Sequence, residues 1–66
     1  MNVETIGTNA GLIWNALNES KTMNLKDLKK ATKLKEKESF LALGWLAREG
    51  KIYIEEAEKD VFITLL

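Results

Sequence analysis

The chain has 66 residues, of which 45% are hydrophobic and 30% charged, and ten basic side chains balance ten acidic ones. This length indicates a single domain, residues 1–66, and the balanced charge gives no overall field that would attract nucleic acid. Because cysteine and histidine are absent, disulfides, thiol or imidazole catalysis and the usual zinc sites are excluded, and we expect no enzymatic activity, no cofactor and no metal.

The first predicted helix covers about residues 5–19. Its apolar side chains recur at helical spacing, and they are Ile6, Ala10, Ile13, Trp14 and Leu17. Gly7 and Gly11 lie one turn apart on this helix. They predict a groove in which another element packs closely.

The second predicted helix covers about residues 25–32. Asn24 is a good N-cap, and Asp27 three residues later resembles a capping box. We expect this helix to bury Leu25, Leu28 and Ala31. Met23, just before the helix, is expected to join a sheet as a very short strand.

A tight turn at residues 33–35 leads to a third predicted helix at about residues 36–49, which Gly50 ends. Leu34 is expected to point inward from the turn. The spacing assigns the core face of the third helix to Phe40, Leu43, Leu46 and Ala47. The outward positions are then Lys37, Glu38, Leu41, Ala42, Trp45 and Arg48.

The C-terminal part of the chain changes to the alternating pattern of β-strands, at residues 51–55 and 60–65 around a polar turn. Pairing Glu55 with Asp60 predicts three further pairs: Ile54 with Val61, Tyr53 with Phe62, and Ile52 with Ile63. One face of this hairpin is then aliphatic, and the other carries Tyr53, Phe62 and Thr64. The element order predicts an α+β winged helix-turn-helix fold, with three helices, a very short first strand and a C-terminal β-hairpin wing.

Two segments carry a family resemblance. The segment Ala42–Ile52 resembles the third helix and wing entry of winged helix-turn-helix proteins, and Ile6–Trp14 adds a similar N-terminal pattern. Together they resemble one family of small stand-alone winged-helix proteins of unassigned function. The resemblance covers nearly the whole chain and implies a stand-alone winged helix, a homodimer, and DNA binding presumed from the fold.

Charge is segregated along the chain. Residues 21–37 contain seven lysines and two acids, a net charge of +5, whereas residues 49–66 have a net charge of −3. Lysines of this kind hold a helix-turn-helix motif on DNA phosphates, although a solvated lysine face has the same pattern. The expected nucleic-acid-binding residues are Lys26, Lys29, Lys30, Lys33, Lys35, Lys37 and Ser39.

The third helix and the wing are less typical of DNA binding. Leu41 and Trp45 are poor readers of bases and form an exposed apolar stripe, unless Trp45 folds back into the core. The turn at residues 55–60 has four carboxylates and one lysine, whereas a DNA-binding wing normally carries basic side chains. These features favour a protein partner.

A homodimer is expected because a chain this short, without disulfide or metal, has little stability in reserve. The last strand has apolar residues on both faces, and the three helices can cover only one of them, so the other apolar face is left uncovered. Two surfaces remain open as the interface, one on the third helix and one on the sheet. The expected interface residues are Leu41, Trp45, Tyr53, Phe62 and Leu66.

Two hypotheses follow. The first is a homodimeric DNA-binding protein of transcription-regulator type, with double-stranded DNA as its partner. The second is a winged helix that serves as a protein-interaction and dimerisation module without DNA. No segment has the about 20 apolar residues of a membrane helix, and the polar start is unlike a signal peptide, so we expect a cytoplasmic protein without membrane contact.

Overall fold

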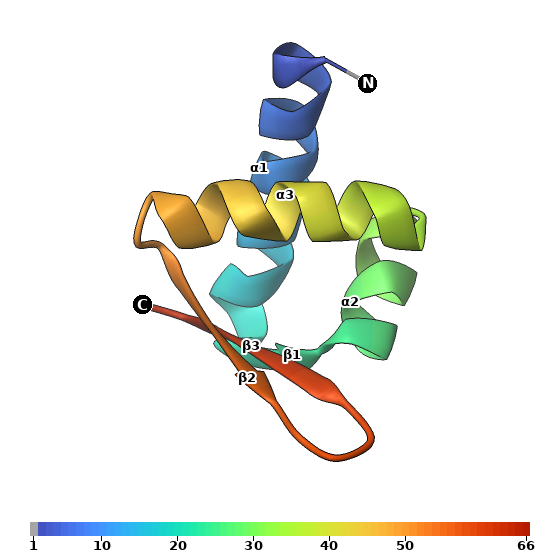
Figure 1. Cartoon of the computed structure of the whole chain (residues 1–66), viewed down its shortest axis with the longest axis vertical. Coiled ribbons are helices and arrows are strands. Elements are labelled where there is room, and N and C mark those ends of the chain that lie inside the picture. The colour runs from blue at the N-terminus through green and yellow to red at the C-terminus, as the bar shows by residue number, and fades with distance from the viewer. Residues whose placement is uncertain (1) are drawn as a thin grey trace.

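The computed structural model describes residues 2–66, which form three helices and one antiparallel sheet (Figure 1). The elements in chain order are α1 (Val3–Ser20), β1 (Thr22–Asn24), α2 (Leu25–Thr32), α3 (Glu36–Arg48), β2 (Ile52–Glu56) and β3 (Val61–Leu65). Helix α3 crosses α1, and the β2–β3 hairpin forms the wing. The predicted α+β winged helix-turn-helix architecture is confirmed, including the short strand that contains Met23.

Side-chain caps begin the first two helices. Asn2 Oδ1 accepts a hydrogen bond from Thr5 N at 2.8 Å, so α1 begins two residues earlier than predicted. Asn24 Oδ1 accepts one from Asp27 N at 2.7 Å, which confirms the predicted N-cap of α2.

Helix α3 begins with Glu38 Oε1 accepting a hydrogen bond from the Lys35 backbone N–H at 2.9 Å. The helix ends at Arg48. Gly50 follows with φ +72°, in the left-handed region that glycine adopts at low cost, and so supplies the predicted stop.

The sheet has the strand order β1-β3-β2, so β3 is its central strand. The predicted hairpin register is wrong, because Ile54 pairs with Ile63 and Tyr53 pairs with Thr64. The loop is therefore 57–60, closed by a hydrogen bond from Ala57 N to the Asp60 carbonyl at 2.8 Å. The register differs from the prediction by two positions, so the predicted membership of each face is unchanged.

The core lies between the helices and the inner, aliphatic face of the sheet. Its buried apolar residues are Ala10, Ile13, Leu17, Leu25, Leu28, Ala42, Leu43, Leu46, Ile52 and Ile63. Leu34 packs against this core from the turn, as predicted. Three expected core residues, Ala31, Phe40 and Ala47, are instead exposed.

Helix α3 is rotated relative to the prediction by about one residue. Ser39 and Ala42 are buried, whereas Phe40 is 50% exposed. The neighbouring helix α1 makes its most extensive contacts with α3. Small side chains permit two helix backbones to approach, and Ser39 and Ala42 take buried positions of α3 while the bulky Phe40 is left outside.

The predicted close packing on Gly7 and Gly11 is not found among the described residues. A Cβ atom at either position would have no heavy atom within 4 Å. The groove along these glycines is open, with Trp14, Leu46 and Lys51 also lining it. None of the three helices is long and apolar enough to cross a membrane within residues 2–66.

Candidate nucleic-acid interface

Three lysines of α2 and Lys33, the residue that caps its C-terminal end, form one basic side. Lys26, Lys29, Lys30 and Lys33 share that side because they are three or four residues apart, and we call them the α2 lysine face. Leu25 and Leu28 are buried on the opposite side of the helix. Helical periodicity therefore fixes the lysines at the surface of the helix-turn-helix unit.

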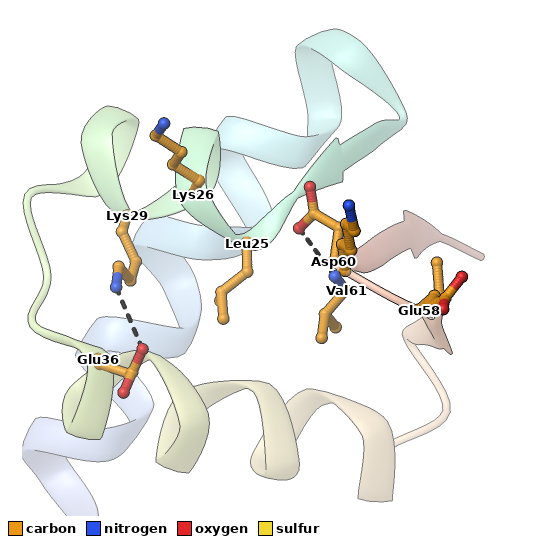
Figure 2. Close-up of a pocket in the computed structure, with 9 residues that line it drawn as sticks. Leu25, Lys26, Lys29, Glu36, Glu58, Asp60 and Val61 are labelled. Carbon is orange, nitrogen blue, oxygen red and sulfur yellow. Dashed lines mark hydrogen bonds and ion pairs between the residues drawn. The ribbon is translucent and has the colours of Figure 1, made fainter.

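Lys29 differs from the other three lysines. It is half-buried, and its Nζ lies 3.3 Å from Glu36 Oε1 at the start of α3 (Figure 2). This ion pair joins α2 to α3 across the turn. Lys29 is thus partly neutralised and is less available to a phosphate.

The remaining predicted lysines are free of carboxylate partners. Within residues 2–66, the ion pairs are Lys29–Glu36 and Lys51–Glu49, the latter at 3.7 Å. The exposed lysines without an ion pair on α2, the turn and the first turn of α3 are Lys26, Lys30, Lys33, Lys35 and Lys37. They follow the helix-turn-helix from one helix into the next, and Asp27 and Glu36 are the two acidic residues among them.

Ser39 does not belong to this surface. It is 0% exposed, so the expectation that it contacts nucleic acid is wrong. The position lies on the side of α3 that faces the core, together with Ala42 and Leu43. The expectation came from its place near the start of the third helix, which in a helix-turn-helix enters the major groove, and from the ability of serine to contact a base or phosphate.

A hollow of about 420 Å³ lies between α2, the start of α3 and the wing tip (Figure 2). Basic and acidic side chains both line it, and they are Lys26, Lys29, Lys59, Glu36, Glu58 and Asp60. Asp60 Oδ1 accepts a hydrogen bond from Val61 N at 2.8 Å, which holds one carboxylate beside the hollow. A phosphate there would meet acidic groups, so the basic surface is the exterior of α2 and not this hollow.

The exposed side of α3 is largely apolar. Leu41 is 44% exposed and Trp45 36% exposed, and Phe40, missed by the sequence prediction, adds to them. A groove of about 350 Å³ runs between this helix and the hairpin, lined by Phe40, Gly44, Ile54 and their neighbours. Lys37 and Arg48 are the exposed basic residues of α3. This helix therefore offers few side chains for hydrogen bonds to base edges.

The expected dimer residues lie on two different surfaces. Leu41 and Trp45 are on α3, on the inner side of the sheet. Tyr53 and Phe62 are on the outer face of the sheet, on β2 and β3. Leu66, after β3, is also exposed. The structure therefore does not bring these residues together in one patch within a single chain.

No group of three or more acidic, histidine or cysteine side chains within residues 2–66 is placed to hold a metal ion. The three elements that meet at the hollow likewise supply lysines and carboxylates without histidine or cysteine. The surface chemistry of the described residues is that of binding through lysine and apolar side chains.

Comparison with known proteins places these features in a family context. The sequence profile of a family described as "Winged helix-turn-helix domain (DUF2582)" matches residues 1–65. Among solved structures, the chain is similar to the solution NMR structure of protein BT2368 from Bacteroides thetaiotaomicron, with 37% sequence identity and a TM-score of 0.86. That similarity covers 98% of this chain and 79% of the other. The comparison with curated proteins gave no match.

Proposed function

Since the chain belongs to the DUF2582 family of winged helix-turn-helix domains, we propose that it is a non-catalytic, regulator-type protein that binds double-stranded DNA. The observation that carries this proposal is the row of exposed, unpaired lysines from α2 through the turn into α3. Lysines at these positions of a helix-turn-helix are suited to DNA phosphates, which supply most of the affinity in non-specific binding.

The apolar exterior of α3 limits how such binding can occur. Leu41 and Trp45 take positions where a sequence-reading helix carries hydrogen-bonding side chains. Lys37 and Arg48 can contact phosphate or guanine, but they lie at opposite ends of the helix. We therefore expect binding that is dominated by phosphates and has weak sequence preference.

The test is fluorescence anisotropy with a mixed-sequence duplex at a series of salt concentrations. If three to five lysines contact phosphates, the slope of log K against log salt is about −0.9 for each contact, or roughly −3 to −5 in total. A single reversal, Lys30→Glu, should lower the affinity and reduce this slope, because it replaces attraction by repulsion on the α2 lysine face.

Lys59→Glu is the matched control, since it makes the same charge change at an exposed position of the hairpin loop, outside the α2 lysine face and outside β2. It should leave the salt slope unchanged. If Lys30→Glu and Lys59→Glu weaken binding equally, the affinity depends on the net charge of the protein and the α2 lysine face is not the DNA-binding site. If the unmodified protein leaves the anisotropy unchanged at low salt, the proposal fails.

A second function, a protein-interaction module, is favoured by one specific observation. Phe40, Leu41 and Trp45 are all at least a third exposed on one helix, and clustered exposed apolar residues mark interaction surfaces. NMR titration with duplex DNA distinguishes the two functions. Shifts confined to residues 26–37 support DNA binding, and an unchanged spectrum supports the interaction module.

A further inference from the structure

Strand β2 is an edge of the sheet, and within residues 2–66 no strand lies beside one side of its backbone. The Lys51 carbonyl accepts a hydrogen bond from Leu66 N at 2.9 Å, which shows that Lys51 directs its peptide oxygen toward the β3 side. In an antiparallel pair, residues alternate between pointing toward and away from the neighbouring strand. The backbone groups directed to the free edge therefore belong to Ile52, Ile54 and Glu56.

We propose that this free edge pairs with β2 of a second copy of the chain, antiparallel and about a two-fold axis through Tyr53. The proposal is independent of DNA binding. It makes one six-stranded sheet from two three-stranded sheets, with Ile52 hydrogen-bonded to Ile54 of the second copy. Exposed edges are templates for strand addition, and a two-fold axis closes the assembly at two chains.

Charge selects this register. In an antiparallel pair, two directly opposed residues point to the same face of the sheet, whereas successive residues of one strand point to opposite faces. A two-fold axis between two residues would oppose residues of different faces, so the axis must pass through a residue of the strand. With the axis at Tyr53, Lys51 faces Glu55 of the second copy, and the same pair repeats across the axis. Moving the axis to Ile52 places Lys51 opposite a tyrosine, and moving it to Ile54 places Glu56 opposite the buried Ile52. Only the register at Tyr53 opposes unlike charges.

Aromatic side chains on the outer face support the same axis. Tyr53 is 56% exposed, and it pairs with Thr64 on β3, so Phe62 is its diagonal neighbour. A Tyr53 pair on the axis is of the non-hydrogen-bonded type, in which side chains are closest. The exposed Tyr53 and Phe62 of both copies then form one continuous aromatic row across the axis.

In this arrangement, the acidic wing tip lies beside a basic region of the second copy. Beyond Glu55, the chain continues to Glu56 and Glu58, which would lie beside the beginning of β2 in the second copy. That region carries Lys51 and Arg48, both exposed. The present partner of Lys51 is Glu49, at a long 3.7 Å. The unusual negative charge of the wing is thus complementary to a basic region of the same chain.

Two single charge-reversal variants, and an equimolar mixture of them, test the proposal. Sedimentation at protein concentrations of tens to hundreds of micromolar measures whether each sample is monomer or dimer. The unmodified chain should be a dimer. In a Lys51→Glu dimer, glutamate faces glutamate in both 51–55 pairs, and in a Glu55→Lys dimer lysine faces lysine in both. Each variant should therefore dimerise about tenfold more weakly or worse. An equimolar mixture of the two variants restores both unlike pairs, so it should form a heterodimer with an affinity near that of the unmodified chain.

Backbone pairing is tested separately with Ile54→Pro. Proline removes an N–H that is directed to the free edge and leaves the bonds to β3 in place. Ile54→Ala is the matched control, because it shortens the same side chain and keeps the N–H. We expect monomers from Ile54→Pro and dimers from Ile54→Ala, with a dispersed amide NMR spectrum confirming that each variant is folded.

Three results would overturn the proposal. The first is a monomeric unmodified chain at these concentrations. The second is a mixture of the two charge variants that remains monomeric. The third is loss of the dimer in Trp45→Lys, which changes α3 and leaves β2 intact, since that result would place the interface on the helix.

Discussion

Ser39 and Asn9 are the two buried polar side chains of the described residues, and each has a polar atom without a hydrogen-bond partner. Ser39 Oγ and Asn9 Nδ2 lie on the two helices that pack most extensively against each other. A buried hydroxyl without a partner costs about 1–3 kcal/mol of folding free energy. Both residues are polar, yet the packing of α1 against α3 leaves them buried.

Ser39→Ala should therefore stabilise the protein. The substitution keeps the small volume at the α1–α3 contact and removes the unpartnered hydroxyl. We expect a gain of about 1 kcal/mol, or roughly 4–8 °C in Tm for a domain of this size. Thermal unfolding followed by circular dichroism measures the change. A lower Tm in Ser39→Ala would show that the hydroxyl has a stabilising partner after all.

The rotation of α3 shows why individual facing residues were hard to predict. The sequence pattern assigned the core to the bulky apolar residues, Phe40 among them, because hydrophobicity was the available signal. In the structure, where α3 packs mainly against α1, the smaller Ser39 and Ala42 are buried instead. Leu43 and Leu46 were predicted correctly because both rotations bury them. The orientation of a helix that combines small and large apolar residues depends on its neighbour and not on its own period.

At the scale of elements, helix boundaries could be predicted where the sequence contains a recognisable capping residue. Asn24 with Asp27 fixed α2 at 25–32 without error, and Gly50 fixed the end of α3 to within one residue. Asn2 was overlooked as a cap, and α1 was predicted two residues too short at its beginning. Local hydrogen-bonding chemistry is sufficient for these boundaries.

The hairpin register required information from outside the hairpin. Loops at 56–59 and 57–60 have the same length and similar charge, so the turn sequence does not distinguish them. In the structure, Asp60 accepts hydrogen bonds from Ala57 N and Val61 N, and Leu65 N donates to the Lys21 carbonyl near β1. The pairing of β3 with β1 thus helps to set the register of β3 with β2.

Helix α2 offers a stability prediction with an internal control. Leu28 is 0% exposed beneath the α2 lysine face, and Leu28→Ala should cost about 2–5 kcal/mol because it leaves a cavity in the core. Leu41→Ala makes the same substitution at an exposed position of α3 and should change stability by no more than about 0.5 kcal/mol. Urea denaturation measures both. Equal losses in the two variants would show that the core is assigned to the wrong faces.

At the scale of the whole molecule, the fold was predictable because every level of the sequence agrees with it. Three helical periods, one change to alternation and a short strand before α2 specify the winged helix-turn-helix, which the structure and the family confirm. The candidate sites were predicted less completely. The lysines could be named from sequence, but the ion pair of Lys29 with Glu36 and the burial of Ser39 depend on how α2 and α3 meet.

The sheet also has an edge, along β2, beside which residues 2–66 place no other strand, and self-association at this edge has a thermodynamic consequence. Dimerisation stabilises the folded state alone, so Tm must rise with protein concentration once that concentration exceeds the dimer Kd. A hundredfold increase, from about 5 µM to about 500 µM, adds up to roughly 1.4 kcal/mol per chain, which corresponds to about 5–10 °C.

Thermal melts of the unmodified chain and of Lys51→Glu across this concentration range test the consequence. The Tm of the unmodified chain should rise by several degrees, whereas the Tm of Lys51→Glu should stay nearly constant because its strand edges repel each other. Lys30→Glu carries the same charge change on α2 and should behave like the unmodified chain. If Tm is independent of concentration in all three proteins, the folded chain derives no stability from self-association, and its 66 residues are stable as a monomer.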